Sequence, residues 1–118
     1  MAEYQENYQK FFDSIYTNDL DKIEKAIREL TTEDFILHEM REPKRDVSLD
    51  LYFENFKKDF LNEENHKINF VNCFSVGDMM AASATYEFMK KESKEKVRME
   101  IFFIDRFEGD KIVEEWVW

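Results

Sequence analysis

The sequence predicts an α+β protein, with three N-terminal helices packed on a curved, mostly antiparallel sheet that forms a cone with a pocket. Two observations support this prediction. Apolar residues recur at helical spacing in three segments of the first half, whereas the second half alternates between apolar and polar residues and is divided by short turns. Helices followed by hairpin-linked strands are typical of α+β domains, in which the helices cover one face of the sheet.

Each of the three predicted helices has an apolar stripe. Residues 4–16 carry aromatic side chains at helical spacing, and residues 20–30 follow a capping Asp19 and have one apolar side. A third helix follows Ser48, and its stripe is Leu49, Phe53, Phe56 and Phe60. Residues 35–39 are predicted as a short strand between the second and third helices, and residues 40–46, with the only proline, as a loop.

Four longer strands make up the rest of the prediction. Residues 66–76 alternate so that Ile68, Phe70, Phe74 and Val76 are expected on one face, and a Gly-Asp turn at 77–78 leads to a strand over residues 79–89. A charged loop covers residues 90–96. The last two strands, residues 97–108 and 111–118, are joined by a second Gly-Asp turn.

Length and charge limit the classes of function. The 118 residues are expected to form one domain over residues 1–118, and 43% are hydrophobic and 16% aromatic. The net charge of −10 repels phosphate backbones, so nucleic acid is not an expected partner. A single cysteine fits a reducing compartment, and neither a signal peptide nor an apolar run of membrane-spanning length is found. We therefore expect a soluble cytoplasmic protein without a membrane partner.

One acidic residue interrupts the apolar side of the strand over residues 97–107. Five of its six odd-numbered positions are apolar, and the sixth is Asp105. Side chains two residues apart share a face of a strand, so Asp105 is expected among apolar groups. A carboxylate in such a place costs free energy unless it is paired, hydrogen-bonded or protonated. It is therefore either an acid/base group in a pocket or one half of a salt bridge to Arg41, Arg98 or Arg106.

The turn at residues 109–110 predicts which residue faces Asp105. In a two-residue loop, Asp105 faces Glu114 and Phe103 faces Trp116, which keeps the apolar sides together. Two neighbouring carboxyl groups raise each other's pKa, and a carboxyl tuned upward can act as general acid or base near neutral pH. A three-residue loop would instead bring Val113, Glu115 and Val117 to that side; we favour the first register.

Several strings resemble the SnoaL-like branch of the nuclear transport factor two-like (cystatin-like) superfamily. The strongest lies at residues 104–107 and 109–116, where an Asp, an aromatic residue two positions later, a Gly-containing turn, Lys-Ile, Glu and Trp follow the family pattern. Residues 18–21 resemble the start of the family's second helix, and residues 33–38 its first strand. The sequence departs from the pattern at Val117, where an Asp is common, and in the order of the Gly-Asp turn.

The resemblance implies a pocket enzyme or a binding protein of the same shape. Members of the family include polyketide cyclases, isomerases and dehydratases, and in the cyclases an Asp matching Asp105 looks like the acid/base. A His in the first strand often faces the pocket, which suggests His38, although an edge-strand position outside the pocket is an equal alternative. The candidate catalytic residues are Asp105, His38 and Glu114.

Six aromatic residues are candidates for the ligand-binding wall. They are Trp116, Phe103, Tyr16, Phe12, Tyr52 and Phe56. Tyrosines on helical stripes are more often part of the core, although a hydroxyl could reach the cavity. The two histidines are far apart and lack a metal-ligand pattern, and no phosphate or dinucleotide motif occurs, so neither metal nor cofactor is expected.

Three functions fit this reading. The first is a cofactor-independent acid/base isomerase, cyclase or dehydratase that uses Asp105 on a small apolar or carbonyl-containing molecule. The second is a ligand-binding domain without catalysis, and the third is a dimerisation module whose cavity is filled by its own side chains. A homodimer through the outer face of the sheet is expected in any case, because Phe102, Ile104, Val113 and Val117 are predicted to lie there.

Overall fold

The structure is a computed structural model that describes residues 3–118, with side chains from Glu6 onward. The elements in chain order are η1 Glu3–Tyr8, α1 Gln9–Ile15, α2 Leu20–Leu30, β1 Thr31–Glu39, β2 Arg45–Ser48, α3 Leu49–Leu61, β3 Glu63–Val76, β4 Met79–Lys90, β5 Lys96–Glu108 and β6 Lys111–Val117. Within this part of the chain, no helix is both long enough and apolar enough to cross a membrane.

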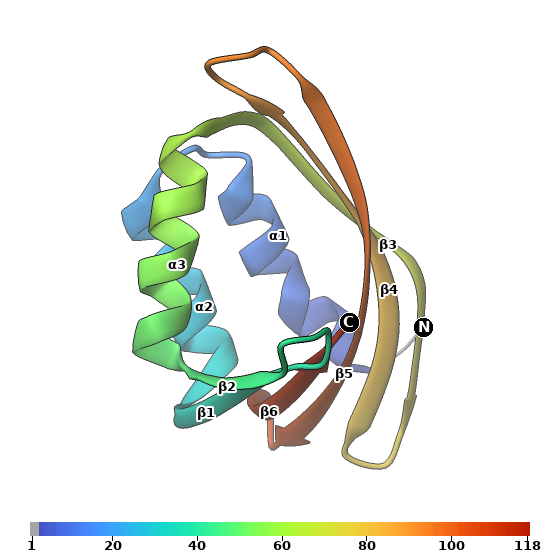
Figure 1. Ribbon diagram of the computed structural model, residues 1–118. Helices are drawn as coiled ribbons and strands as arrows, with labels where there is room; N and C mark the ends of the chain where they lie inside the picture. Colours follow the sequence, from blue (N-terminus) through green and yellow to red (C-terminus); the bar gives the residue numbers. More distant parts are fainter. Residues whose placement is uncertain (1–2) are drawn as a thin grey trace.

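The helices lie on one side of a curved six-stranded sheet (Figure 1). The strand order is β2-β1-β6-β5-β4-β3, and every neighbouring pair is antiparallel except β1 and β6. The predicted α+β fold with a curved, mostly antiparallel sheet is therefore confirmed. β6, the last strand of the chain, lies between β5 and β1 in the interior of the sheet, antiparallel to β5 and parallel to β1.

Two helix starts follow the capping rules. Asp19 accepts hydrogen bonds from the backbone of Asp21 and Lys22 at the start of α2, and Ser48 accepts one from Leu51 at the start of α3. Asn18 precedes α2 with a positive φ of 57°, a conformation that asparagine tolerates better than most residues. Local sequence therefore sets both starts.

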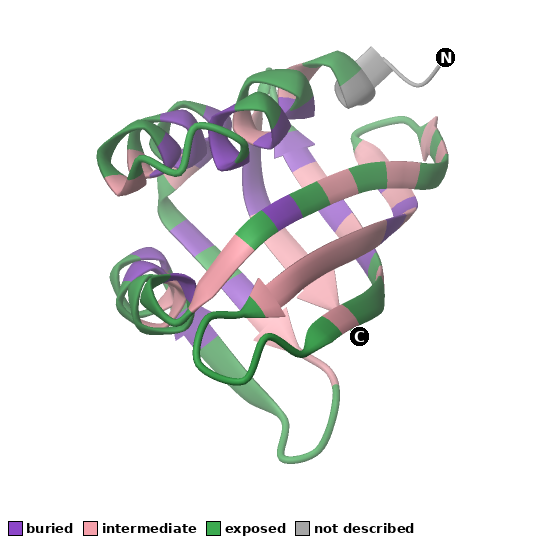
Figure 2. Cartoon of the chain, turned by 90° about the horizontal axis from the view of Figure 1, so that it is seen from above, coloured by how far each residue is buried: buried purple, intermediate pink, exposed green. Residues whose placement is uncertain are grey.

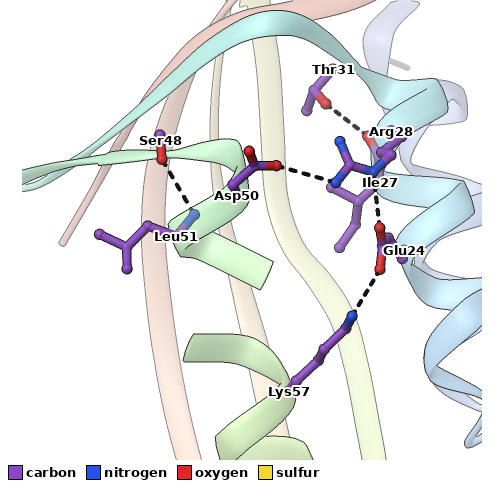
Figure 3. Close-up of polar contacts among 8 residues, drawn as sticks. All are labelled: Glu24, Ile27, Arg28, Thr31, Ser48, Asp50, Leu51 and Lys57. Atoms are coloured by element: carbon purple, nitrogen blue, oxygen red, sulfur yellow. Dashed lines mark hydrogen bonds and ion pairs between the residues drawn. The ribbon is translucent and has the colours of Figure 1, made fainter. Parts of the chain in front are cut away.

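Ion pairs connect α2 and α3 at the surface (Figure 3). Arg28 lies 3.0 Å from Glu24 and 3.3 Å from Asp50, and Lys57 lies 3.1 Å from Glu24. These side chains are substantially exposed, and such pairs contribute little to stability because water and salt screen them. The buried core supplies most of the stability instead, and buried residues occur on both helices and strands (Figure 2).

Strand boundaries differ from the prediction at several places, most clearly in β1 and β2, while β3 begins at Glu63 instead of residue 66. β1 begins at Thr31, since Thr31 already pairs with Ile112 of β6, so only the second half of the strand was predicted. Arg45 and Asp46, the end of the predicted loop, belong to β2, whose Val47 pairs with Leu37 and is 1% exposed. In both cases the strand forms because a distant segment offers it a hydrogen-bonding edge.

A bulge in β3 changes which of its side chains face the helices, so part of the prediction for this strand was wrong. Phe70 pairs with Ala84, but the next registered pair is Asn72 with Ser83. The extra residue reverses the alternation, because successive side chains point to opposite faces. Ile68 and Phe70 therefore face the helices, whereas Phe74 and Val76, predicted on the same face, are 64% and 77% exposed, and Cys73 packs against the core instead.

The outer face of the sheet has a continuous row of paired residues. Phe74 pairs with Ala81, Ala81 with Ile104, Ile104 with Trp116, and Trp116 with His38. Phe102 and Trp118, in the next row, are 50% and 41% exposed. The outward position of Phe102 was predicted correctly, but Val113 is buried and Val117 contacts the cavity on the opposite side.

Candidate functional site

A cavity of about 400 Å³ lies between the helices and the sheet. That volume falls within the range of small-molecule sites. Its wall is largely aromatic and aliphatic, and the polar groups that reach it are Tyr8, Tyr52, Asp59, Glu63, Tyr86 and Glu115. Four of the predicted wall residues contact it, namely Phe12, Tyr52, Phe56 and Phe103.

Asp105 lies directly behind the cavity wall. It is on β5, its exposed fraction is 0%, and its Oδ2 accepts a short hydrogen bond from the hydroxyl of Tyr8, at the end of η1. The same hydroxyl lies 3.3 Å from Oε2 of Glu115. Oδ1 of Asp105 has no hydrogen-bond partner among the described residues. The apolar surroundings expected for Asp105 are present, and a tyrosine, not an arginine, contacts it.

Glu115, not Glu114, pairs with Asp105 across the hairpin. The two-residue turn is present, since Glu108 pairs with Lys111 and Phe107 with Ile112. Arg106 then pairs with Glu114, so Val113 is an extra residue on β6.

The physical reason for this bulge is burial of two consecutive apolar residues. Ile112 and Val113 are 2% and 9% exposed, which regular alternation along a strand would not allow. The predicted pairing of Asp105 with Glu114 and of Phe103 with Trp116 was therefore wrong. Glu115 and Val117 reach the cavity with the two-residue turn intact.

Burial dominates the electrostatics of this group. It raises the pKa of Asp105 well above its ordinary value, and the neighbouring charge of Glu115 raises it further. Burial also raises the pKa of Glu115, partly offset by hydrogen bonds with Asp105 and Tyr8. Burial and the two carboxylates raise the pKa of Tyr8, so the phenol stays protonated. Because the two groups are adjacent, loss of a proton from one of them makes loss of a proton from the other more costly.

His38, Glu114 and Trp116 lie together on the outer face of the sheet, away from the cavity. His38 Nδ1 is 2.6 Å from Asp46 and Nε2 is 2.6 Å from Glu114, and the imidazole stacks on Trp116 with centroids 5.2 Å apart. Glu114 also accepts a hydrogen bond from Arg106 at 3.2 Å. The predicted cavity position of Glu114 and Trp116 was wrong, because one extra residue turns this part of β6 over. For His38, on β1, the alternative position outside the pocket is the one found.

Tyr16 is the remaining predicted wall residue. It is 52% exposed, and its hydroxyl exchanges hydrogen bonds with the backbone N–H and C=O of Ile68 at 3.0 and 3.2 Å. It therefore ties α1 to β3 outside the cavity. Among the side chains that the structure describes, from Glu6 onward, no three of His, Cys, Asp or Glu are grouped so that they could hold a metal ion.

A sequence model of SnoaL-like polyketide cyclases matches residues 3–118. The chain belongs to this family. The SnoaL-like family predicted from the sequence, most strongly at residues 104–116, is thus confirmed, and the match covers nearly the whole chain. Curated protein sequences gave no match.

Solved structures share the SnoaL-like fold at low identity. AclR, a candidate hydroxylase from Streptomyces galilaeus, has a TM-score of 0.80 and 15% identity, covering 98% of this chain and 77% of that one. IdmH, a candidate polyketide cyclase from Streptomyces antibioticus, has a TM-score of 0.80 and 12% identity, covering 98% and 91%. A hypothetical protein with a ketosteroid isomerase-like fold from Catenulispora acidiphila, in complex with trimethylamine, has a TM-score of 0.75 and 11% identity, covering 97% and 85%. Identities this low show the fold alone.

The raised pKa of Asp105 predicts a pH-dependent effect of Asp105→Asn on stability. Ionising a group whose folded pKa lies above its unfolded value of ~3.9 costs free energy in the folded state only. We expect the variant and wild type to be equally stable near pH 3–4. As pH rises through the folded pKa, the variant should become more stable by at least about 1 kcal/mol. Urea denaturation at several pH values measures this, and a constant difference would contradict the buried pair.

The two histidines should titrate on opposite sides of the unperturbed value of ~6.5. Partial burial opposes protonation of His38, but hydrogen bonds with Asp46 and Glu114 outweigh it and raise its pKa. Burial and Lys91 lower the pKa of His66. The stability contributed by His38 should be fully present below pH 6.5 and lost as pH rises through its folded pKa.

The measurement is NMR titration of the imidazoles together with denaturation of His38→Gln. The variant should be less stable than wild type by about 1 kcal/mol or less below pH 6.5, and the gap should close above the folded pKa. His66, the other histidine of the chain, serves as the internal control. If both imidazoles titrated near pH 6.5, the carboxylates of the outer-face cluster would not raise the pKa of His38, and the prediction would be wrong.

Proposed function

We propose that this protein binds a small apolar carbonyl compound in the cavity and catalyses proton transfer on it, as an isomerase, cyclase or dehydratase of the SnoaL-like family. The observation that carries the proposal is the buried pair of Asp105 and Glu115, which meet Tyr8 at the cavity wall. A polar group of this kind is costly in an apolar core, and such groups cluster at functional sites. A cytoplasmic location remains part of the proposal.

Glu115 is the carboxyl that a ligand would meet, because it contacts the cavity whereas Asp105 is fully enclosed. When the pair holds one proton, the ionised member can accept a proton from the carbon next to a carbonyl group. With Glu115 as the base, Asp105 holds the proton of the pair, and the Tyr8 hydroxyl at the cavity wall can turn from Asp105 to donate to the carbonyl oxygen and stabilise its negative charge. Return of the proton to another carbon completes an isomerisation, and attack of the enolate carbon on a second carbonyl would close a ring.

The alternative is a binding protein of the same shape that does no chemistry. Full enclosure of Asp105 is the observation that favours it, since a carboxyl without access to the ligand can act only through Glu115 or Tyr8. The two functions share the cavity, so ligand binding does not separate them. A carboxyl variant that binds the ligand but no longer turns it over would distinguish the enzyme from the binding protein.

Neutralising either carboxyl should remove catalysis. The test compares wild type with Asp105→Asn and Glu115→Gln for exchange of the α protons of 2-tetralone, an apolar ketone, in heavy water followed by NMR. Positioned acid/base groups contribute about 10²–10⁴-fold, so we expect a loss of that size in both variants.

Glu100→Gln is the matched control. Glu100 is an exposed carboxylate on the same strand as Asp105, and its residue number places it on the opposite face. This variant should exchange protons at the wild-type rate. If wild type binds 2-tetralone without accelerating exchange beyond the Asp105→Asn variant, the protein acts on this ketone as a binding protein only.

We also propose that a second copy of this chain covers the outer face of the sheet. A one-sided sheet is expected to be polar on its solvent face, but here Phe74, Phe102 and Trp118 are 64%, 50% and 41% exposed. Contiguous exposed apolar surface usually marks an interface. The row from Phe74 through Ile104 to Trp116 crosses four strands, so a partner could bury a broad part of the sheet.

Phe102→Glu should convert a dimer to a monomer, because it places a charge in the centre of this apolar face. Sedimentation velocity measures the mass of both proteins across micromolar concentrations. Leu61→Glu is the control, since Leu61 is a 61% exposed apolar residue at the end of α3 and off the sheet. A wild-type protein that stays monomeric throughout this range would rule out the dimer.

A further inference from the structure

The cavity has a second polar end, distant from Asp105. It is formed by Asp59 in the last turn of α3, Glu63 at the start of β3, and Tyr86 on β4. Tyr86 pairs with Met99 of β5, whereas Met80 pairs with Asp105. Six residues of β5 separate the two levels, which corresponds to about 20 Å of strand at ~3.3 Å per residue. The two ends therefore meet different parts of a ligand.

The charge of the cavity wall has one sign. Its lining includes three carboxyl groups, on Asp59, Glu63 and Glu115, and no Lys, Arg or His among the described residues. Near Asp59 and Glu63 the wall is aromatic. Phe56, Phe60, Tyr86 and Phe88 all line it, and the rings of Phe56 and Phe60 stack at 5.5 Å.

We propose that this end of the cavity, built from Asp59, Glu63 and the aromatic rings beside them, binds a positively charged amine on an otherwise apolar ligand. The inference rests on the proposed ligand cavity and adds the charge of the ligand to it. Carboxylates pair with an ammonium group, and the electron-rich faces of aromatic rings attract cations. The same wall repels carboxylates and phosphates, in agreement with a chain whose net charge is −10.

His66 supports Glu63 from behind the wall. Its side chain is 1% exposed and stacks on Phe60 with centroids 4.1 Å apart. Its Nε2 lies 3.4 Å from Oε1 of Glu63, yet neither ring nitrogen makes a hydrogen bond with a described residue. A buried donor without an acceptor costs free energy. Ionisation of Glu63 beside a bound ammonium would give Nε2–H a charged acceptor, so we assign His66 as a positioning residue.

The groups around Glu63 set the pH dependence of this binding. Burial and the negative charge of Asp59 raise the pKa of Glu63 to about 7, and Lys90 opposes them. Tyr86 faces the same group, and burial together with the charge of Glu63 raises the pKa of its phenol well above the ordinary value. Burial and Lys91 lower the pKa of His66, which favours its neutral form. A cation favours ionised Glu63, so its binding should release a proton and tighten as pH rises through 7.

The test uses three probes with the same apolar chain, namely octyltrimethylammonium, octanol and octanoate, titrated by calorimetry into the full chain. We expect octyltrimethylammonium to bind most tightly and octanoate least. The quaternary head does not titrate, so its affinity should rise between pH 6 and 8 because of the protein alone. Glu63→Gln should weaken it by about tenfold to a hundredfold and remove that pH dependence, and should leave octanol unchanged.

Glu64→Gln is the matched control, because Glu64 is the next residue, pairs with Lys94 at 2.7 Å and does not line the cavity. Asp59→Asn, at an exposed position, gives a second test that does not disturb the core. Octanoate binding as tightly as the cation, or an unchanged affinity in Glu63→Gln, would overturn the amine site. Proton exchange on 2-tetralone that depends on Glu115 would then still support the proposed function. Binding of none of the probes would also overturn this inference.

Discussion

The burial of two carboxyl groups side by side is the constraint on which the rest of this structure depends. Asp105 and Glu115 need one shared proton and a donor, and η1 supplies that donor as the hydroxyl of Tyr8. The first helical segment must therefore close over β5 and β6 for the pair to be tolerated. Burial raises the pKa of both carboxyl groups, so ionising them costs more free energy in the folded than in the unfolded protein.

A single extra residue in β6 determines what each face of the sheet presents. With Val113 as the bulge, Glu115 and Val117 reach the cavity, while Glu114 and Trp116 lie outside with His38. Without the bulge, both sets would exchange places, because alternation has a period of two. The bulge thus separates a buried acid pair from an outer cluster in which His38 bridges two carboxylates.

The cavity combines an aromatic wall with negative charge at both ends. At the first end lie Glu115 and, behind the wall, Asp105, the pair to which we assign proton transfer on a carbonyl compound. At the second end lies Glu63, with His66 beside it, to which we assign recognition of a cation. The surface ion pairs between α2 and α3 contribute little by comparison, since their side chains are substantially exposed.

The sequence by itself determined the three helices, most strand positions, the Gly-Asp turns and the burial of Asp105, because helical spacing, capping and alternation are local properties. It also named Phe12, Tyr52, Phe56 and Phe103 as cavity wall. Only the tertiary structure decided the parallel pairing of β1 with β6, the formation of β2, the bulges in β3 and β6, and hence the partner of Asp105. A bulge leaves almost no local signal, since burial of Ile112 together with Val113 depends on which helices and strands pack over that corner.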